Sequence, residues 1–453
     1  MNDIFALIDC NNFYVSCERV FNPKLENVPV AVLSNNDGVI IARSNEVKKL
    51  GIKMGTPAFK CRDIIEKNNI KIFSSNYVLY GDMSSRVMMT LAQFTDDIEV
   101  YSIDEAFLSL KEREDEIAQR FVFDEKNDEK KFKDRAGRIG METSFALFGR
   151  EIRKTIKKWT GIPVSVGIAR TKTLSKIANE LVKKDTEYNG VLDISNLTDK
   201  QIDEYLEKIS IEDVWGIGFR TAPMLRAHGF YTAKDLKYVD DRWVRKLLHI
   251  TGLRTVHELR GISCIAFENE RKPQQTLAST RSFGRPILSL KELKEAVSTY
   301  AIQAAERLRE QKLIAPFMNV FIHTNYFNEN QARYNNSLGV QFSQPTNDTR
   351  VLIKEACRII DKIYKPGYLY KKAGIILFNL MPETQIQLNL FHAYEQDKKA
   401  ARLMKAVDKI NDQNGRNTIL FAAAGIKKPW KMNSRIVSKR YTTRWNEIIE
   451  AKI

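Results

Sequence analysis

The chain is poor in cysteine and lacks a cysteine framework. Only five of its 453 residues are cysteines, and none of them forms a Cys-x-x-Cys pair. They are odd in number and widely scattered, at positions 10, 17, 61, 264 and 357. Disulfide scaffolds and zinc sites need closely spaced cysteines. The pattern argues against both and predicts reduced core residues in a cytosolic protein.

Long hydrophobic runs are also absent. No stretch approaches the roughly 18 apolar residues that a transmembrane helix needs. The chain begins Met1-Asn2-Asp3, with no basic region ahead of its short apolar run, so a secretory signal is not expected. We predict a soluble cytoplasmic protein.

Acidic residues are outnumbered. The 56 Asp and Glu face 72 Lys and Arg, which gives a net charge of +16 and suits a polyanionic partner such as nucleic acid. The excess is uneven, because residues 384–453 carry 14 basic and 6 acidic residues, half of the net charge. The length predicts about three or four domains.

The acids that are present include three beside apolar strands. Asp9 closes the apolar run 4–8, and Asp104-Glu105 lies within Tyr101-Ser102-Ile103-Asp104-Glu105-Ala106-Phe107. Clustered carboxylates near apolar strands raise one another's pKa unless cations neutralise them, and Mg²⁺ is suited to oxygen ligands and phosphates. Two such ions about 3.5–4 Å apart are typical of phosphoryl or nucleotidyl transfer.

An alternative is that these acids are ordinary turn residues. On a regular strand Asp104 and Glu105 point to opposite faces, so both serve one site only if the backbone bends there. The wider sequence favours the metal site. The stretches that carry the signal are DCNNFYVSCE (9–18), YSIDE (101–105), VSVGIA (164–169), Lys172, Lys176, Ala178-Asn179 and VWGIG (214–218).

Together these stretches resemble the Y-family translesion DNA polymerases over nearly the whole chain. Four more are similar to the UmuC type of that family, the catalytic subunit of bacterial DNA polymerase V: LSNNDG (33–38), FSSNY (73–77), FGREIR (148–153) and RYTTR (440–444). The resemblance implies an α+β multidomain fold shaped like a right hand. Its parts would be a palm with a mixed sheet (1–22 and 76–190), small fingers (23–75), a helical thumb (191–262), a linker (263–275), an α/β little finger (276–383) and a basic C-terminal tail (384–453).

Hydrophobic patterning predicts the elements within this plan. The expected strands are 4–9, 98–101, 106–110, 164–169, 319–323 and 373–377. One helix is expected to begin near residue 13. Further helices are expected at 44–50, 145–159, 291–311 and 351–364. Residues 111–142 carry mixed charge with little apolar periodicity, which predicts a surface insertion that is partly disordered. Relatives of the UmuC type generally have far fewer residues here.

Two loop motifs carry further predictions. Gly216-Ile217-Gly218 precedes the helical stretch 221–228, and Thr232-Ala233-Lys234-Asp235 is a capping box. Glycines between helices let backbone N–H groups approach a DNA phosphate, although a plain helix-linking turn fits the three residues equally well. The polymerase resemblance favours DNA phosphate binding by Gly216 and Gly218.

Gln387-Leu388-Asn389-Leu390-Phe391 resembles the peptide by which bacterial polymerases dock on the β sliding clamp. Gln387 would bond at a pocket rim, and Leu388, Leu390 and Phe391 would contact the clamp, with Leu390 and Phe391 as apolar anchors. An ordinary amphipathic turn is the alternative.

The resemblance also implies the roles of single residues. Asp9, Asp104 and Glu105 would be the catalytic carboxylates and would hold two Mg²⁺ ions, with the backbone carbonyl of Cys10 as a further ligand. Many relatives have a second Asp where this chain has Asn11, which leaves the three acids intact.

The nucleotide site follows in the same way. Tyr14 stands at the steric gate, where an aromatic ring clashes with a ribose 2′-hydroxyl, although core packing would also explain it. Lys48 and Lys183 match cations that hold the incoming triphosphate, and Asn45, where many relatives have Tyr, would add a weaker polar contact.

The predicted activity is error-prone, DNA-templated addition of deoxynucleotides to a primer 3′-hydroxyl opposite damaged template in the SOS response. The implied partners are primer-template DNA, dNTP, the β sliding clamp, a processed UmuD dimer and a RecA filament. A two-metal nuclease or phosphatase would use the same acids but has no use for a sugar gate. A noncatalytic DNA-binding scaffold is disfavoured by the intact acids.

Overall fold

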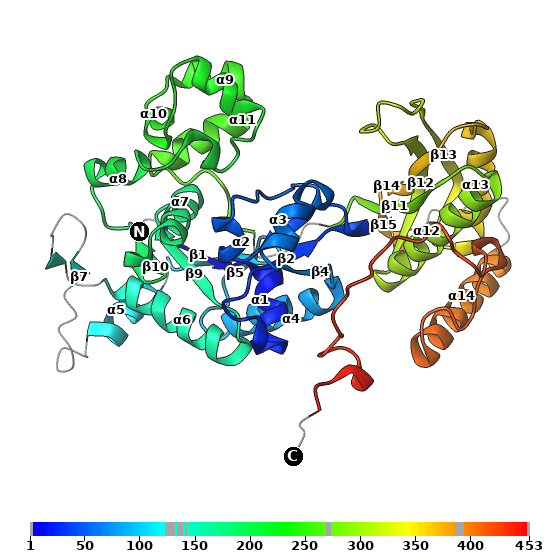
Figure 1. Cartoon of the computed structure of the whole chain (residues 1–453), viewed down its shortest axis with the longest axis horizontal. Coiled ribbons are helices and arrows are strands. Elements are labelled where there is room, and N and C mark those ends of the chain that lie inside the picture. The colour runs from blue at the N-terminus through cyan, green and yellow to red at the C-terminus, as the bar shows by residue number, and fades with distance from the viewer. Residues whose placement is uncertain are drawn as a thin grey trace. The chain divides into compact units, whose positions relative to one another are not determined.

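The computed structural model describes residues 3–111, 113–122, 132–133, 139–140, 143–268, 273–385 and 394–450. The chain divides into two compact units. The first contains Met1–Val32, Ile40–Arg271 and Ile436–Ile453, and the second contains Leu33–Val39 and Lys272–Arg435 (Figure 1). The step from one unit to the next at 271–272 falls within the predicted linker.

The first unit is built on a five-stranded sheet in the order β10-β9-β1-β6-β5. Its central strand, β1 (Phe5–Cys10), is buried throughout and pairs antiparallel with β6 (Glu105–Ser109) and β9 (Val164–Ala169). The outer strands are β5 (Ile98–Val100) and β10 (Val191–Asp193). The strands predicted around 4–9, 98–101, 106–110 and 164–169 are confirmed within a residue or so.

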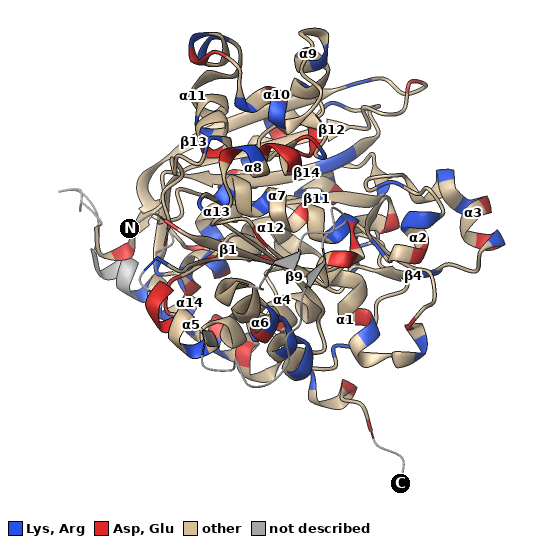
Figure 2. Cartoon of the chain, turned by 90° about the vertical axis from the view of Figure 1, so that its left-hand side faces the viewer, with Lys and Arg blue, Asp and Glu red and all other residues tan. Residues whose placement is uncertain are grey.

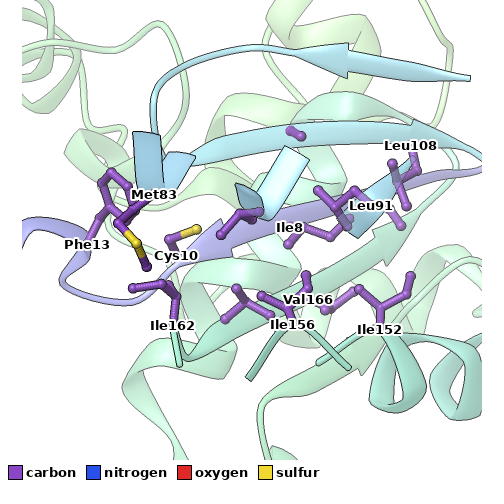
Figure 3. Packing of buried hydrophobic residues seen from close by; sticks show 14 of the residues in the cluster. Ile8, Cys10, Phe13, Met83, Leu91, Leu108, Ile152, Ile156, Ile162 and Val166 are labelled. Atoms are coloured by element: carbon purple, nitrogen blue, oxygen red, sulfur yellow. The ribbon is translucent and has the colours of Figure 1, made fainter. Parts of the chain in front are cut away.

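One face of this sheet packs on α4 (Tyr77–Leu91) and α6 (Ser144–Thr160). Figure 3 shows Ile8, Val166 and Leu108 of the strands gathered with Leu91 of α4 and Ile152 of α6. The apolar stripe of each helix is buried against the sheet and so removed from water. This burial is the main source of stability for such a layer.

Helix α7 (Lys172–Lys184) packs directly on the sheet. Gly167 of β9 makes this possible, because a Cβ there would lie 2.3 Å from the Ser175 carbonyl oxygen and 2.4 Å from the Asn179 nitrogen. Ser175 and Asn179 also donate hydrogen bonds to backbone carbonyls of β1. The VSVGIA stretch therefore fixes α7, and the lysines on it, beside the acids of β1 and β6.

The smaller elements of the first unit follow α1 (Phe13–Phe21). A three-stranded sheet has the order β3-β2-β4. Its strands and helices are β2 (Val30–Leu33), β3 (Ile40–Arg43), β4 (Lys71–Ser74), α2 (Asn45–Lys49) and α3 (Arg62–Lys67). Helix α2 ends before Gly51, which has a φ of 78° and so adopts the left-handed conformation that stops the helix.

The segment predicted as a surface insertion contains a short helix that its charge pattern does not predict. Helix α5 (Glu114–Val122) begins with three acidic residues, visible in red in Figure 2, which suit the positive end of the helix dipole. Ile117 is buried, and Phe121 packs edge-on to Phe148 of α6. Two short paired strands follow, β7 (Phe132–Lys133) and β8 (Ile139–Gly140).

A helical region follows β10 and has its own hydrophobic core. Its helices are α8 (Asp199–Leu206), α9 (Thr221–Ala227), α10 (Ala233–Lys237) and α11 (Asp241–Leu259). The predicted capping box is confirmed: the Thr232 side chain accepts from the backbone of Asp235, and Asp235 accepts from the backbone of Thr232.

The second unit is a sheet in the order β11-β14-β12-β13 packed on two helices. The predicted helices and strands are all present. The elements are β11 (Thr276–Ile287), α12 (Leu290–Glu310), β12 (Leu313–Thr324), β13 (Asn335–Thr346), α13 (Thr349–Ile363), β14 (Tyr370–Phe378), β15 (Met381–Pro382) and α14 (Tyr394–Asn414). Trp430 packs into the same core.

Short 3-10 helices join these elements. They lie at Pro23–Leu25, Asn35–Asp37, Ala58–Cys61, Thr186–Tyr188, Ile211–Asp213, Glu383–Gln385, Ala422–Ala424 and Trp445–Glu447. In the part of the chain that the structure describes, no helix is both long enough and apolar enough to cross a membrane.

Candidate active site

The strand register sets two of the three predicted acids opposite each other and places the third in the adjoining turn. Asp9 and Glu105 are direct partners across β1 and β6, and the Cys10 amide donates to the Asp104 carbonyl oxygen at 2.8 Å. Asp104 stands in the tight turn between β5 and β6, where the Tyr101 and Ser102 amides both donate to the Glu105 carbonyl oxygen. The chain therefore bends at the Asp-Glu pair, as a shared site requires.

Asp9 is a buried carboxyl group with an unusual proton affinity. Its pKa is raised to about 7. Burial is the largest cause, the hydrogen bond with Glu105 and the Glu105 charge act in the same direction, and the nearby Lys183 opposes them. The Lys183 Nζ lies 2.6 Å from an Asp9 oxygen. A carboxyl that titrates near neutrality beside a second carboxyl is typical of a functional site.

Glu105 has the opposite balance. Burial works to raise its pKa, but the charge and hydrogen bond of Lys176 bring that pKa below the usual range. The Lys176 Nζ lies 2.8 Å from a Glu105 oxygen and also sits over the Tyr101 and Trp215 rings. Each of the two facing carboxyls is thus matched by one ammonium group of α7.

The donor set fits Mg²⁺, although the side chains do not form a closed metal site. Among the described residues, no three His, Cys, Asp or Glu side chains lie close enough together to hold a metal ion. Asp104 instead accepts a hydrogen bond from the Ser102 hydroxyl at 2.6 Å. All three acids nevertheless offer oxygen, the donor that a hard cation prefers.

Tyr14 lies on α1. Its ring stacks on the Tyr80 ring with centroids 4.4 Å apart and planes 14° apart, and it meets the Tyr77 ring edge-on at 6.1 Å. The Tyr14 side chain is partly exposed, and partial burial raises its pKa to about 12. The structure therefore gives this ring a packing role on one face.

Lys48 and Asn45 lie on α2. The Lys48 side chain is exposed overall, yet the protein around its ammonium group lowers its pKa, and the charges of Arg43 and Lys183 lower it further. Asn45 accepts a hydrogen bond from the Asn12 side chain at 3.1 Å. Lys48, Lys183 and Asp9 thus share one electrostatic environment.

Arg43 is a residue that the sequence analysis missed. Its Nε and one terminal nitrogen are buried and have no hydrogen-bond partner among the residues that the structure describes. A buried guanidinium group without a partner is costly and is suited to an anion such as phosphate. Its position at the end of β3, directly before the Ser44 cap of α2, is the signal that could have drawn attention to it.

The glycines of the predicted phosphate-binding turn differ in their requirements. Gly216 has a φ of 88°, which favours glycine, and a Cβ there would lie 3.3 Å from the Thr255 hydroxyl. A Cβ on Gly218 would meet nothing within 4 Å, and the next residue, Phe219, is 82% exposed. The backbone at Gly218 is therefore open to an approaching group. Gln387, Leu388, Leu390 and Phe391 lie outside the described residues.

Sequence comparisons agree with this geometry. The impB/mucB/samB family profile matches residues 8–180, and the C-terminal domain profile of the same family matches 274–390. The chain is 40% identical over 452 residues to Protein UmuC of Salmonella typhimurium strain LT2, covering 99% of this chain and 100% of that protein.

The chain belongs to the impB/mucB/samB family, the UmuC type of Y-family DNA polymerase. Another family member, Protein MucB of Escherichia coli, is 36% identical over 450 residues, covering 99% of this chain and 100% of that protein. DNA polymerase IV of Bacillus velezensis is 25% identical, covering 93% of this chain and 92% of its own.

A solved structure has a similar fold. The solved Y-family DNA polymerase chimera Dbh-Dpo4(243-245)-Dbh matches with a TM-score of 0.62 at 20% identity, covering 84% of this chain and 99% of its own. Residues 401–451 match a separate domain of unknown function. The predicted α+β polymerase fold is confirmed for this family member.

Proposed function

We propose that this Y-family polymerase is an error-prone translesion enzyme that adds deoxynucleotides to a primer 3′-hydroxyl opposite damaged template, in the SOS response of a bacterial cytoplasm. The observation that carries the proposal is the register that sets Asp9 opposite Glu105, with Asp104 in the adjoining turn. The relatives named UmuC, MucB and DNA polymerase IV support the same reading.

Asp9, Asp104 and Glu105 would hold two Mg²⁺ ions, with the Cys10 carbonyl as a further ligand. When bound, the ions would activate the primer hydroxyl and stabilise charge on the leaving pyrophosphate. Asp9 is buried and Glu105 is partly buried, and the low dielectric around Asp9 strengthens its electrostatic interactions. Tyr14, on the adjacent helix, would exclude nucleotides that carry a 2′-hydroxyl.

Arg43, Lys48 and Lys183 would receive the triphosphate, with Asn45 as a weaker polar contact. Burial is the largest cause of the lowered Lys48 pKa, and the like charges of Arg43 and Lys183 lower it further. An incoming triphosphate would relieve this repulsion. Lys183, which contacts Asp9 in the structure, would turn toward the β- and γ-phosphates.

The Lys48→Ala variant is expected to weaken dNTP use, because a hydrogen bond to a charged group is lost. We expect the KM for dNTP to rise by about tenfold or more. Lys49→Ala is the matched control, since Lys49 is the exposed neighbour on the same helix. Steady-state single-nucleotide insertion with both variants gives the comparison. Equal KM values for the two variants would contradict the proposal that Lys48 binds the triphosphate.

The proposed partners besides primer-template DNA and dNTP are the β sliding clamp, a processed UmuD dimer and a RecA filament. Gly216 and Gly218 would contact DNA phosphate through their backbone, a contact that reads no base. The net charge of +16 would favour DNA binding in general.

Replacing Gln387, Leu390 and Phe391 together with Ala is expected to abolish clamp docking. The change removes a hydrogen bond and two apolar anchors, and anchors of this kind can contribute ~2 kcal/mol or more each. Clamp affinity, measured by surface plasmon resonance, should fall by at least about a hundredfold. DNA affinity and its salt dependence should not change, because no Lys or Arg is altered. Clamp affinity equal to that of the parent would contradict the motif assignment.

The decisive test of the whole proposal is primer extension on undamaged and lesion-bearing templates, with and without the accessory subunits, in the presence of Mg²⁺. Extension past the lesion with frequent misinsertion is expected. Cleavage of the primer or template with no extension under all of these conditions would instead indicate a nuclease.

A further inference from the structure

The C-terminal part of the first unit contains a docked segment, Ile436–Tyr441, that follows β4 and reaches α1. The Ser74 amide donates to the Ile436 carbonyl oxygen at 2.9 Å, and the Ile436 amide donates to the Ser74 hydroxyl at 3.0 Å. Val437 forms a parallel bridge to Ser74, and the Tyr441 ring stacks on Phe21 of α1 at 4.8 Å. Hydrogen bonds and an aromatic stack therefore hold the segment at both ends.

Between these ends, Ser438 makes a buried polar connection. The Asn76 side-chain nitrogen donates to the Ser438 carbonyl oxygen and hydroxyl, each at 3.0 Å, and to the Lys439 carbonyl oxygen at 3.3 Å. The Ser438 hydroxyl donates in turn to Glu18 at 3.0 Å. Glu18 and Asn76 are 2% and 3% exposed, so little water is available to replace these bonds.

Glu18 links Ser438 to the aromatic rings around Tyr14. The same Glu18 oxygen accepts a hydrogen bond from the Tyr80 hydroxyl at 2.7 Å. Tyr80 is fully buried, and its ring is the one on which Tyr14 stacks. Asn76 also caps α4, the helix that carries Tyr77 and Tyr80, by accepting from the Leu79 amide.

We propose that Ile436–Tyr441 is a positioning element for the Tyr14 ring: it fixes Glu18 and the first turn of α4, and these in turn hold Tyr80. The proposal rests on the gate role of Tyr14 in the proposed function. The proposal also assigns a structural role to part of the region 401–451, which matches a domain profile of unknown function.

The physical reason is the small tolerance of a steric gate. A ring that excludes a hydroxyl group by contact loses discrimination when it moves by a fraction of the van der Waals distance, about 1 Å. Tyr14 is partly exposed, and its ring stacks on Tyr80 and meets Tyr77 edge-on, so a shift in the first turn of α4 would move both of these neighbours. Within the described residues, the Tyr80 hydroxyl donates to Glu18, and the Ser438 hydroxyl donates to the same Glu18 oxygen.

The first test compares two neighbouring substitutions in the full-length chain, assayed with its accessory subunits. Ser438→Ala removes the hydrogen bond to Glu18, whereas Lys439→Ala changes an exposed side chain and leaves the backbone contacts in place. We expect Ser438→Ala to reduce discrimination between dNTP and rNTP, measured as the ratio of kcat/KM values, by about three- to tenfold. Insertion of dNTP should stay within about twofold, and Lys439→Ala should change neither quantity.

A double-mutant cycle tests the route. Tyr80→Phe keeps the stacking ring and deletes the hydroxyl that Glu18 holds. If the effect of Ser438 passes through this bond, adding Ser438→Ala to Tyr80→Phe should give no further loss of discrimination. Fully additive effects of the two changes, or a Ser438→Ala protein that discriminates like the parent, would overturn the proposal.

Tyr14→Ala separates this inference from the function on which it rests. If Tyr14→Ala loses discrimination and Ser438→Ala does not, the positioning role fails while the gate stands; if Tyr14→Ala has no effect, the gate assignment itself fails. Hydrogen exchange gives a readout that needs no activity. The amides of Leu79 and Tyr80 should exchange faster in Ser438→Ala than in Lys439→Ala, and equal rates would contradict the proposal.

Discussion

Primer extension should be abolished, by at least about a thousandfold, when Asp104 is replaced with Asn or Glu105 with Gln. Each change preserves side-chain shape but removes one negative charge from the site proposed to bind two divalent ions. Primer-template affinity should remain within about threefold of the parent, because the basic residues that contact phosphate are unchanged. Single-turnover extension and fluorescence anisotropy with labelled primer-template measure the two quantities.

Glu116→Gln is the matched control for charge. Glu116 is an exposed residue of α5 and forms an ion pair with Arg113 on the surface. This variant should extend primers like the parent, since a surface ion pair contributes little. Polymerisation retained by clean preparations of both active-site variants would overturn the assignment of these acids. Loss of DNA binding together with extension would point to misfolding.

The sequence was sufficient to predict the sheet that carries the site. The apolar run before Asp9 and the stretch after Glu105 are short and continuous, as expected for strands buried on both faces, and both form neighbouring strands. The lysines of α7 were identified through family resemblance alone. That Lys176 and Lys183 each face one acid follows from the tight packing of α7 at Gly167, which no local pattern reveals.

The helix within the charged insertion is not apparent from the sequence. Ile117 and Phe121 stand four residues apart, the spacing of one helix face, but the charged residues around them hide this short apolar stripe. Packing of Phe121 against Phe148 stabilises the helix, and that contact depends on the tertiary structure.

The contacts of the C-terminal segment were outside the reach of sequence analysis for a different reason. Ser438 and Glu18 are 420 residues apart in the sequence, and no local sequence pattern around either residue predicts that the two make a hydrogen bond. A buried carboxylate also looks unremarkable in the sequence, although burial raises the Glu18 pKa against the hydrogen bonds from Tyr80 and Ser438. Only the fold brings these groups together.

The second large effect concerns sugar choice, and Tyr14→Ala is the variant that tests it. Removing the ring opens the space that it occupies beside Tyr80 and removes the proposed clash with a ribose 2′-hydroxyl. We expect rNTP insertion to rise relative to dNTP insertion by on the order of a hundredfold, as when a pocket loses its means of excluding a larger substrate. Insertion of dNTP should fall far less, because the proposed carboxylates and phosphate-binding cations remain.

Tyr14→Phe is the control that separates ring from hydroxyl. The Tyr14 ring makes the stacking contact with Tyr80, so Phe should preserve both the stack and the exclusion of ribonucleotides. Competition between each rNTP and its matching dNTP on one primer-template measures both variants under identical conditions. If discrimination in Tyr14→Ala equals that of the parent, another residue excludes the 2′-hydroxyl. If Tyr14→Phe loses discrimination as Ala does, selection depends on the hydroxyl group rather than on the bulk of the ring.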